Sequence, residues 1–275
     1  MTAPAREWDG DPRLAGARAE VHRTVGGVEL MAYVFGAEER GAGAPIARPG
    51  IVFFFGGGWQ SGTPAQFGMQ CRHLAARGMV AICAEYRVHE RHGATPWDCV
   101  ADAKSAMRWA RANAGRLGLD PARLAAGGGS AGGHLAASTA LVPGCDAPGD
   151  DPAISPAPLA LVLFNPVLDT TAARWFERFG DRARELSPLH NVRPGAPPAI
   201  IFHGTADEIV PFDQARAFAE AMHTVGSRCE LSAFEGAGHG FFNYAKDPQG
   251  AYLETLRAAD RFLASLGWLS GEPGI

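Results

Sequence analysis

The sequence lacks the features that would indicate a membrane-bound, secreted or nucleic-acid-binding protein. It has no apolar run near the length that spans a bilayer, so we expect no membrane partner. Residues 1–14 are polar, with scattered proline and glycine, and have no apolar centre like that of a signal peptide, which favours a cytoplasmic location. A net charge of −4 gives no electrostatic reason to expect nucleic acid as a partner.

Cysteine is scarce and shows no binding pattern. The five cysteines are odd in number, and no two have C-x-x-C spacing. Cys83 lies in an apolar run and Cys99 in a helical pattern, so both are expected to be small buried side chains. We expect free thiols without a catalytic role. His89-Glu90-Arg91-His92 has too short a spacing for the helical zinc motif and is expected to be a solvated loop.

Length and local patterns predict a single α/β domain. The chain has 275 residues and no internal repeat, which suits an N-terminal extension at residues 1–16 followed by one domain at 17–270. In two segments, about Ala17–Val25 and Val28–Phe35, apolar residues alternate with polar ones. Gly26-Gly27 joins the segments, which together predict a β-hairpin.

The remaining pattern alternates between buried strands and helices. Continuous apolar runs, typical of strands covered on both faces, occur at Ile51–Phe55, Met79–Ala84, Leu124–Ala126, Leu159–Phe164 and Ala199–Phe202. Helical patterns occur at about Ala65–Arg77, Asp98–Ala114, Ala131–Leu141, Phe212–Val225 and Ala251–Leu266. This order predicts a mostly parallel, doubly wound sheet flanked by helices. Residues 142–158 are expected to form a surface loop, and the irregular residues 169–194 at most a small lid or rim.

Gly128-Gly129-Ser130-Ala131-Gly132 is the most informative stretch. It fits G-x-S-x-G, which places a serine on a strained turn between a strand and a helix. An apolar run precedes it and a helical pattern follows, which is the context that the motif requires. Ser130 is therefore the candidate nucleophile, although the same position also suits a helix N-cap.

A serine nucleophile needs a base and an acid that orients the base. In this strand–turn–helix arrangement they follow the serine in the order acid, then histidine. We assign Asp207, after the apolar run that ends in His203-Gly204, and His239, in the glycine-rich loop after Phe234. Alternatives remain: other candidate acids are Glu208 and Asp213, and other candidate histidines are His134 and His203.

Three glycines directly follow the apolar run that ends at Phe55. Bare backbone N–H groups suit a site that stabilises an oxyanion, so Gly57 and Gly58, with the N–H of Ala131 after the nucleophile, are the candidate donors. The alternative is a plain flexible turn.

These motifs resemble the α/β-hydrolase superfamily, in particular esterases and lipases related to hormone-sensitive lipase and to bacterial carbohydrate acetyl- or feruloyl-esterases. The resemblance covers about residues 28–266 and implies an α/β-hydrolase fold. It rests on Phe55–Trp59, Glu85-Tyr86-Arg87, Asp102–Ala106, Gly128–Gly133, His203–Asp207 and Gly238–Gly240. The family often has histidine where this chain has Phe55, which leaves open how the glycine loop is held.

The resemblance implies a two-step ester hydrolysis through an acyl-enzyme on Ser130, without a metal or an organic cofactor. It suggests a small acyl group, such as acetate on a sugar or another small alcohol. Trp59, Phe241 and Phe242 are candidates to line the pocket, or simply to fill the core. The sequence leaves both a monomer and a homo-oligomer open.

Three rival interpretations are weaker. Gly127–Gly132 also satisfies G-x-G-x-x-G, but it lies in the middle of the chain, and the acidic residues after it fall in a loop rather than at a strand end. A prolyl-oligopeptidase-like peptidase shares the order of the triad but usually carries a large extra domain. A binding module without catalysis usually lacks a member of the triad.

Overall fold

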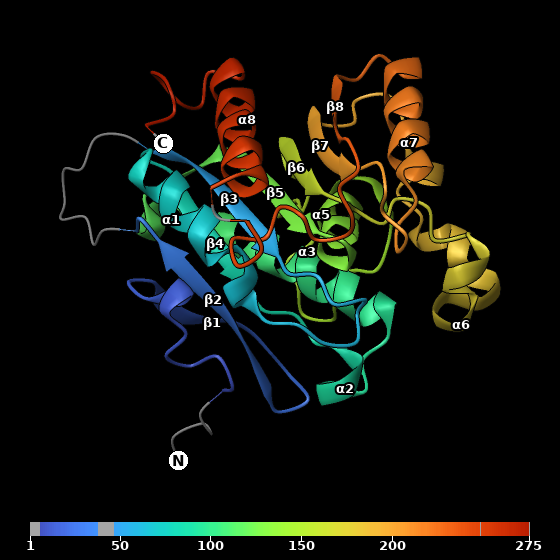
Figure 1. The fold of residues 1–275 in the computed structure, drawn as a ribbon. Helices are drawn as coiled ribbons and strands as arrows, with labels where there is room; N and C mark the ends of the chain where they lie inside the picture. Colours follow the sequence, from blue (N-terminus) through green and yellow to red (C-terminus); the bar gives the residue numbers. More distant parts are fainter. Residues whose placement is uncertain (1–5, 38–46, 248, 275) are drawn as a thin grey trace.

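The computed structural model describes residues 6–37, 47–247 and 249–274 and is built on an eight-stranded sheet (Figure 1). The strand order is β1-β2-β4-β3-β5-β6-β7-β8. The strands are β1 (Arg18–Val25), β2 (Val28–Phe35), β3 (Arg48–Phe54), β4 (Val80–Ala84), β5 (Leu119–Gly129), β6 (Ala160–Phe164), β7 (Ala199–Gly204) and β8 (Cys229–Phe234).

The pairing confirms the predicted mostly parallel sheet with an N-terminal hairpin. β1 pairs antiparallel with β2, and β2 pairs antiparallel with β4, whereas all pairs from β4 to β8 are parallel. β5 begins at Leu119, earlier than expected, because the partly or fully exposed residues Asp120–Arg123 interrupt the apolar run between Leu119 and Leu124. β8 also lacks such a run, since it is an edge strand with alternating burial, and only its end at Phe234 had been predicted.

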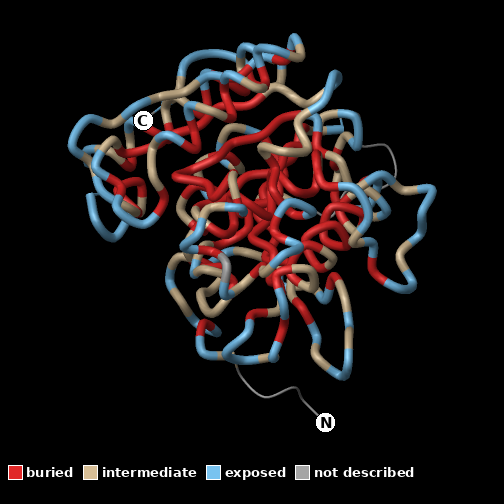
Figure 2. The backbone as a smooth tube through the Cα atoms, turned by 90° about the vertical axis from the view of Figure 1, so that its right-hand side faces the viewer, coloured by how far each residue is buried: buried red, intermediate tan, exposed pale blue. Residues whose placement is uncertain are grey.

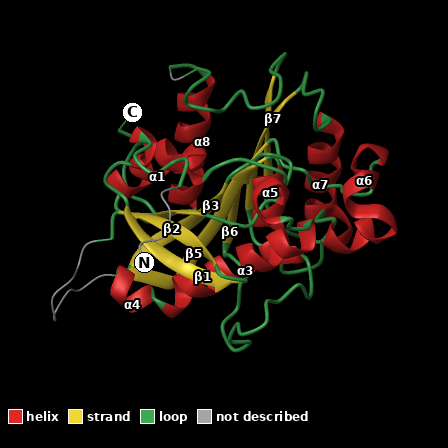
Figure 3. Ribbon diagram, turned by 90° about the horizontal axis from the view of Figure 1, so that it is seen from below, coloured by secondary structure: helices red, strands yellow, loops and turns green. Residues whose placement is uncertain are grey.

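Helices cover both faces of the sheet, as Figures 1 and 3 show. The core on one face is filled from α1 and α8, and the core on the other from α3, α5 and α7. The helices are α1 (Gly68–Ala76), α2 (His89–His92), α3 (Pro96–Ala112), α4 (Ala114–Leu117), α5 (Ala131–Leu141), α6 (Phe176–Phe179), α7 (Phe212–Thr224) and α8 (Ala251–Ser265). Short 3₁₀ turns are η1 (Pro12–Leu14), η2 (Pro64–Phe67), η3 (Ala173–Trp175), η4 (Gly180–Leu186) and η5 (Leu189–Asn191). None of the helices in the described part of the chain combines the length and the apolar character of a membrane span.

The central strands are buried and the connections between them are exposed (Figure 2). The described part of the expected N-terminal extension packs on this body: Trp8 is buried, and its Nε1 donates to Tyr33 Oη at 2.8 Å. Whether residues 17–270 alone form the domain stays a prediction. Residues 142–158 form the predicted loop, and Asp146 and Asp150 within it pair with Arg108 on α3.

Residues 169–194 fold into short helical turns that form a rim beside the glycine loop. Trp175 and Phe179 pack edge-on against Trp59, with ring centroids 5.6 and 5.0 Å away, and Arg178 donates to the carbonyl oxygen of Gly58. The parallel strands β3, β5, β6 and β7 all end at one edge, which gathers the connections that follow them.

Candidate active site

Ser130 lies on a strained turn between β5 and α5. Its backbone has φ 54° and ψ −120°, a combination that non-glycine residues rarely adopt. Its N–H donates to the carbonyl oxygen of Phe164 at 2.9 Å, and its own carbonyl oxygen accepts from Val167 N–H at 3.2 Å. Ser130 does occupy the N-cap position of α5, but its side chain makes no capping hydrogen bond. The hydroxyl is therefore not used to stabilise the helix.

The tight packing around the turn explains the small residues of the motif. A Cβ atom on Gly132 would overlap the carbonyl oxygens of Phe54 and Phe55. The end of β3 thus passes directly against the start of α5, and only glycine fits there. This contact brings the loop after β3 beside the nucleophile.

Asp207 and His239 are hydrogen-bonded across two neighbouring loops. His239 Nδ1 donates to Asp207 Oδ2 at 2.8 Å, and Asp207 Oδ1 accepts the N–H groups of Ile209 and Val210, both at 2.9 Å. Burial alone would raise the pKa of the Asp207 carboxyl, but hydrogen bonds from His203 and His239 outweigh it and hold the pKa well below its usual range. The ionised carboxylate can only accept, so His239 carries its proton on Nδ1 and presents the lone pair of Nε2.

Asn165 lies against His239 at the end of β6. Its Nδ2 donates to His239 Nε2 at 3.4 Å, and its Oδ1 accepts from Gly240 N–H at 3.3 Å. Within the described residues no hydrogen bond joins Ser130 to His239. Catalytic hydrogen bonds are often long before substrate binds, and the 3.4 Å contact from Asn165 is long enough for a nearby hydroxyl to replace it at Nε2.

The alternative acids and histidines lie elsewhere. Asp213 pairs with Arg216 at 2.9 Å in an exposed position, and Glu208 is also exposed. His203 is buried and its Nε2 donates to the carbonyl oxygen of Val210 at 2.8 Å, although it also lies 3.4 Å from Asp207 Oδ2. His134 is buried against the rim, where its Nε2 donates to the carbonyl oxygen of Leu186 at 2.8 Å. Neither histidine reaches the surface beside Ser130.

The glycine loop after β3 has a conformation that side chains would disturb. Gly57 has φ +129°, and a Cβ atom there would overlap the carbonyl oxygen of Ser61. Among the hydrogen bonds of the described residues, none is donated by the N–H groups of Gly57, Gly58 or Ala131. These three N–H groups remain available to an oxyanion.

The family often has histidine where this chain has Phe55, and in this chain other side chains hold the loop. Tyr86 Oη donates to the carbonyl oxygen of Phe55 at 2.8 Å, and the two rings stack with centroids 4.1 Å apart. Gln66 Oε1 accepts from Gly56 N–H at 2.6 Å, and Gln66 Nε2 donates to Asn243 Oδ1 at 2.9 Å. With phenylalanine at position 55, the loop is thus held through the hydrogen bonds of Tyr86 and Gln66.

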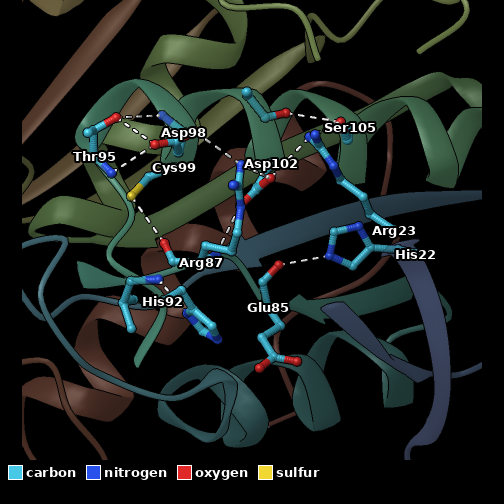
Figure 4. A network of polar contacts seen from close by, with 12 residues as sticks. His22, Arg23, Glu85, Arg87, His92, Thr95, Asp98, Cys99, Asp102 and Ser105 are labelled. Atoms are coloured by element: carbon cyan, nitrogen blue, oxygen red, sulfur yellow. Dashed lines mark hydrogen bonds and ion pairs between the residues drawn. The ribbon is translucent and has the colours of Figure 1, made fainter. Parts of the chain in front are cut away.

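A buried polar network in turn holds the segment that carries Tyr86 (Figure 4). Asp102 on α3 is fully buried and accepts from Arg87 N–H at 3.0 Å and from Arg87 Nε at 2.8 Å. Arg23 on β1 also pairs with Asp102 at 3.0 Å. A buried carboxylate with two arginine partners fixes its surroundings firmly, because breaking either pair leaves a charge uncompensated.

The three aromatic pocket candidates are buried. Trp59 is 1% exposed and Phe242 is 1% exposed, and each is enclosed by other rings, while Phe241 packs on Phe234. A cavity of about 440 Å³ lies next to the glycine loop, but its lining includes none of these three aromatics. Its walls come from Gly56, Gly57 and residues 243–246 instead.

Sequence reasoning missed Asn165, Gln66 and Asn243. Asn165 directly follows an apolar strand, and Asp207 follows one closely. A polar residue just after an apolar strand was therefore a signal that could have identified Asn165. Gln66 and Asn243 carried no signal, because their roles depend on contact between segments 177 residues apart.

The remaining predictions on binding residues can be compared directly with the structure. All five cysteines are free, as expected, although Cys71 and Cys83 lie only 3.3 Å apart at sulfur. His89–His92 is a one-turn helix, α2, rather than a loop, since Gly93 closes it with φ +63°, but its residues are largely exposed as predicted. In the described ranges no group of three or more metal-binding side chains is found.

Comparisons with known proteins find related hydrolases and esterases. The BD-FAE family model matches residues 41–148, and the dienelactone hydrolase family model matches residues 162–270. Esterase LipC from Mycobacterium tuberculosis is 33% identical over 219 residues, which cover 70% of this chain and 53% of that protein. The chain spans about half the length of the first curated relatives that it matches.

Solved structures match over nearly the whole chain. The apo form of esterase 2 from Thermogutta terrifontis superposes with a TM-score of 0.89 at 50% identity, covering 95% of this chain and 98% of that one. The propionate-bound form of the same esterase gives a TM-score of 0.87, again at 50% identity, with 95% and 98% covered. With its eight-stranded sheet and these relatives, the chain belongs to the α/β-hydrolase superfamily, in the group of esterases related to hormone-sensitive lipase.

Proposed function

We propose that the protein is a serine carboxylesterase that hydrolyses esters of small, acetyl-like acyl groups through an acyl-enzyme on Ser130. The observation that carries the proposal is the 2.8 Å bond between His239 Nδ1 and Asp207, which fixes the tautomer of the histidine. Ser130 makes no capping hydrogen bond on its strained turn. The two are linked through Asn165, which contacts His239 and directly follows Phe164, the residue whose carbonyl oxygen accepts Ser130 N–H. This arrangement suits nucleophilic catalysis, because Asp207 orients the base and the long 3.4 Å contact of Asn165 to Nε2 can be replaced when Nε2 accepts a proton.

The first step forms the acyl-enzyme. Ser130 Oγ attacks the carbonyl carbon while His239 Nε2 takes the hydroxyl proton, and the carbonyl electrons move onto the oxygen. The tetrahedral intermediate then collapses, the bond to the leaving alcohol breaks, and His239 returns the proton to that alcohol. Asp207 stays ionised throughout and stabilises the imidazolium, which its lowered pKa supports.

The second step releases the acid. Water attacks the acyl carbon with His239 as base, and the proton returns to Ser130 Oγ as the acid departs. In both steps the N–H groups of Gly57, Gly58 and Ala131 would face the negative oxygen. One such donor is typically worth on the order of 10²–10³ in rate.

Relatives support a small acyl group. Thermogutta terrifontis esterase 2 has been solved phosphorylated by paraoxon and with propionate or butyrate bound. In this chain the described residues 169–194 form a rim of short turns packed on Trp59 rather than a long lid. Both points favour short acyl chains.

The decisive experiment is hydrolysis of 4-nitrophenyl esters from acetate to octanoate by the wild type and by Ser130→Ala. We expect kcat/KM to peak at short acyl chains and to fall by at least about 10³-fold in the variant. Thermal unfolding of both proteins controls for misfolding. A folded wild type without activity on any ester would contradict the proposal, as would a fully active Ser130→Ala.

A further inference from the structure

The cavity of about 440 Å³ lies between the two loops that carry the proposed chemistry. Gly57, which lines it, is also a proposed oxyanion donor. Its neighbour Gly56 lies against the nucleophile, since a Cβ atom on Gly56 would be 3.3 Å from Ser130 Cβ. The opposite wall is the segment just after His239. Ser130 and His239 are not in its lining, so the reacting ester bond lies outside the cavity, and only a group attached to the ester would extend into it past Gly56 and Gly57.

Lys246 is the cation of this wall. Its Nζ donates to the carbonyl oxygen of His239 at 3.1 Å, which directs the ammonium toward the catalytic loop. Lys246 is exposed, and no ion pair joins it to another of the described residues. The chain has only two lysines, and the other, Lys104, is buried and bonds to the carbonyl oxygens of Val142 and Gly144. Lys246 therefore keeps ammonium protons for a ligand.

Among the described residues, no carboxylate lines the cavity to neutralise this charge. Arg13 also lines it, but Asp11 holds both Nε and Nη2 of that guanidinium, at 3.0 and 2.7 Å. Asp247, next in sequence to Lys246, accepts the N–H groups of Gly250 and Ala251, both at 2.9 Å. In the described lining, Lys246 is therefore the cation that has no carboxylate bonded to it, and Thr63 and Tyr244 are further polar residues of the lining.

We propose that this cavity binds the carboxylate of an anionic ester and that Lys246 determines this specificity. The proposal rests on the proposed function, because it concerns which esters the same site prefers. The carboxylate can belong to the acyl group, as in a monoester of a dicarboxylic acid, or to the alcohol, as in an ester of a hydroxy acid. Lys246 would attract either in a cavity without competing anions.

Two matched ester pairs separate these sources. Mono-4-nitrophenyl adipate and 4-nitrophenyl hexanoate differ by a carboxylate on the acyl side. The ester 4-acetoxybenzoate and its methyl ester differ by a carboxylate on the alcohol side. The quantity measured is the ratio of kcat/KM for the anionic ester to that for the neutral ester, compared between variants so that intrinsic reactivity cancels.

The variants are Lys246→Met, Lys246→Arg and the control Arg261→Met, which removes an exposed charge on α8 that does not line the cavity. We expect the ratio for one pair to fall about 3- to 10-fold in Lys246→Met at low salt. It should recover in Lys246→Arg, stay unchanged in Arg261→Met, and fall in the wild type as sodium chloride is added. The pair that responds identifies the side of the ester.

An unchanged ratio in Lys246→Met for both pairs would overturn the inference, and so would an equal fall in Arg261→Met. The salt dependence of the wild type provides the same test if Lys246→Met does not fold. Failure of the proposed function looks different, because neither neutral ester would then be hydrolysed in a way that depends on Ser130.

Discussion

At the scale of single residues, Asn165 connects the nucleophile turn to the histidine loop. It is 1% exposed and has φ 32°, a region that asparagine tolerates better than most residues. Its amide contacts both His239 Nε2 and Gly240 N–H, and the residue before it, Phe164, accepts the N–H of Ser130. Asn165 therefore acts as a positioning residue for His239.

Asn165→Asp would place a carboxylate beside the His239 imidazole. An anion at this distance favours the imidazolium, so the acid limb of the kcat/KM profile should move to higher pH by on the order of one unit. Asn165→Ala should lower kcat about tenfold without that shift. The pH profiles of both variants check this, with Asn113→Asp, at the end of α3, as a remote control. An acid limb that does not move in Asn165→Asp would argue against close contact between the two side chains.

At the scale of elements, the glycine loop after β3 is held from three sides. Tyr86 and Gln66 bond to its first residues, and Arg178 from the rim bonds to Gly58. Gln66 also donates a hydrogen bond to Asn243, and Asn243 Nδ2 in turn donates to the carbonyl oxygen of Gly240 at 2.8 Å. The proposed oxyanion loop and the histidine loop are thus joined by side-chain hydrogen bonds.

Gly57→Ala should disrupt the proposed oxyanion donors. Its Cβ atom would overlap the carbonyl oxygen of Ser61, so the loop must shift, and we expect kcat for short-chain esters to fall about 100-fold or more. Steady-state kinetics measure the loss. The matched control is Gly26→Ala in the β1–β2 turn, where an added Cβ atom meets no atom within 4 Å and activity should be retained. Equal activities of the two variants would remove Gly57 from the catalytic site.

At the scale of the whole molecule, burial of neutral histidines links stability to pH. Burial lowers the pKa of His22 to about 4 and that of His134 to about 4, against hydrogen bonds to the carbonyl oxygens of Glu85 and Leu186 that act in the opposite direction. In the unfolded chain a histidine pKa is about 6.5. As the pH falls from 6.5 toward 4, the unfolded state binds these protons and the folded state does not, so stability is lost.

We expect the free energy of unfolding to fall between pH 7 and pH 5.5 by on the order of 1 kcal/mol for each of these two histidines. His22→Leu should remove about half of this dependence, whatever its effect on stability at pH 7. Denaturant unfolding at the two pH values measures the difference. His89→Asn, at an exposed site, serves as the control. If the unfolding free energy of His22→Leu changes between the two pH values by as much as that of the wild type, the assignment is wrong.

Much of the architecture was predictable because local patterns carry it. Buried parallel strands form continuous apolar runs, and helices have their own periodicity. The succession of β3 to β7 along the chain and the bounds of α5 therefore followed from the residues alone. The strained turn at Ser130 was equally readable, since only small residues allow β3 to pass against α5. The start of β5 at Leu119–Arg123 and most of β8 could not be predicted as strands, because their partly exposed residues lack that pattern.

The sequence by itself determined which chemical groups the candidate site contains. They are a serine on a tight turn, an acid and a histidine after later strands, and bare N–H groups after β3. Only the tertiary structure decided how these groups are supported. The contacts of Gln66, Asn243, Asn165 and Lys246 depend on which loops meet at the edge of the sheet, and a side chain between loops has no periodicity or motif to mark it. Hydrogen bonds between distant segments exist only once the fold has closed.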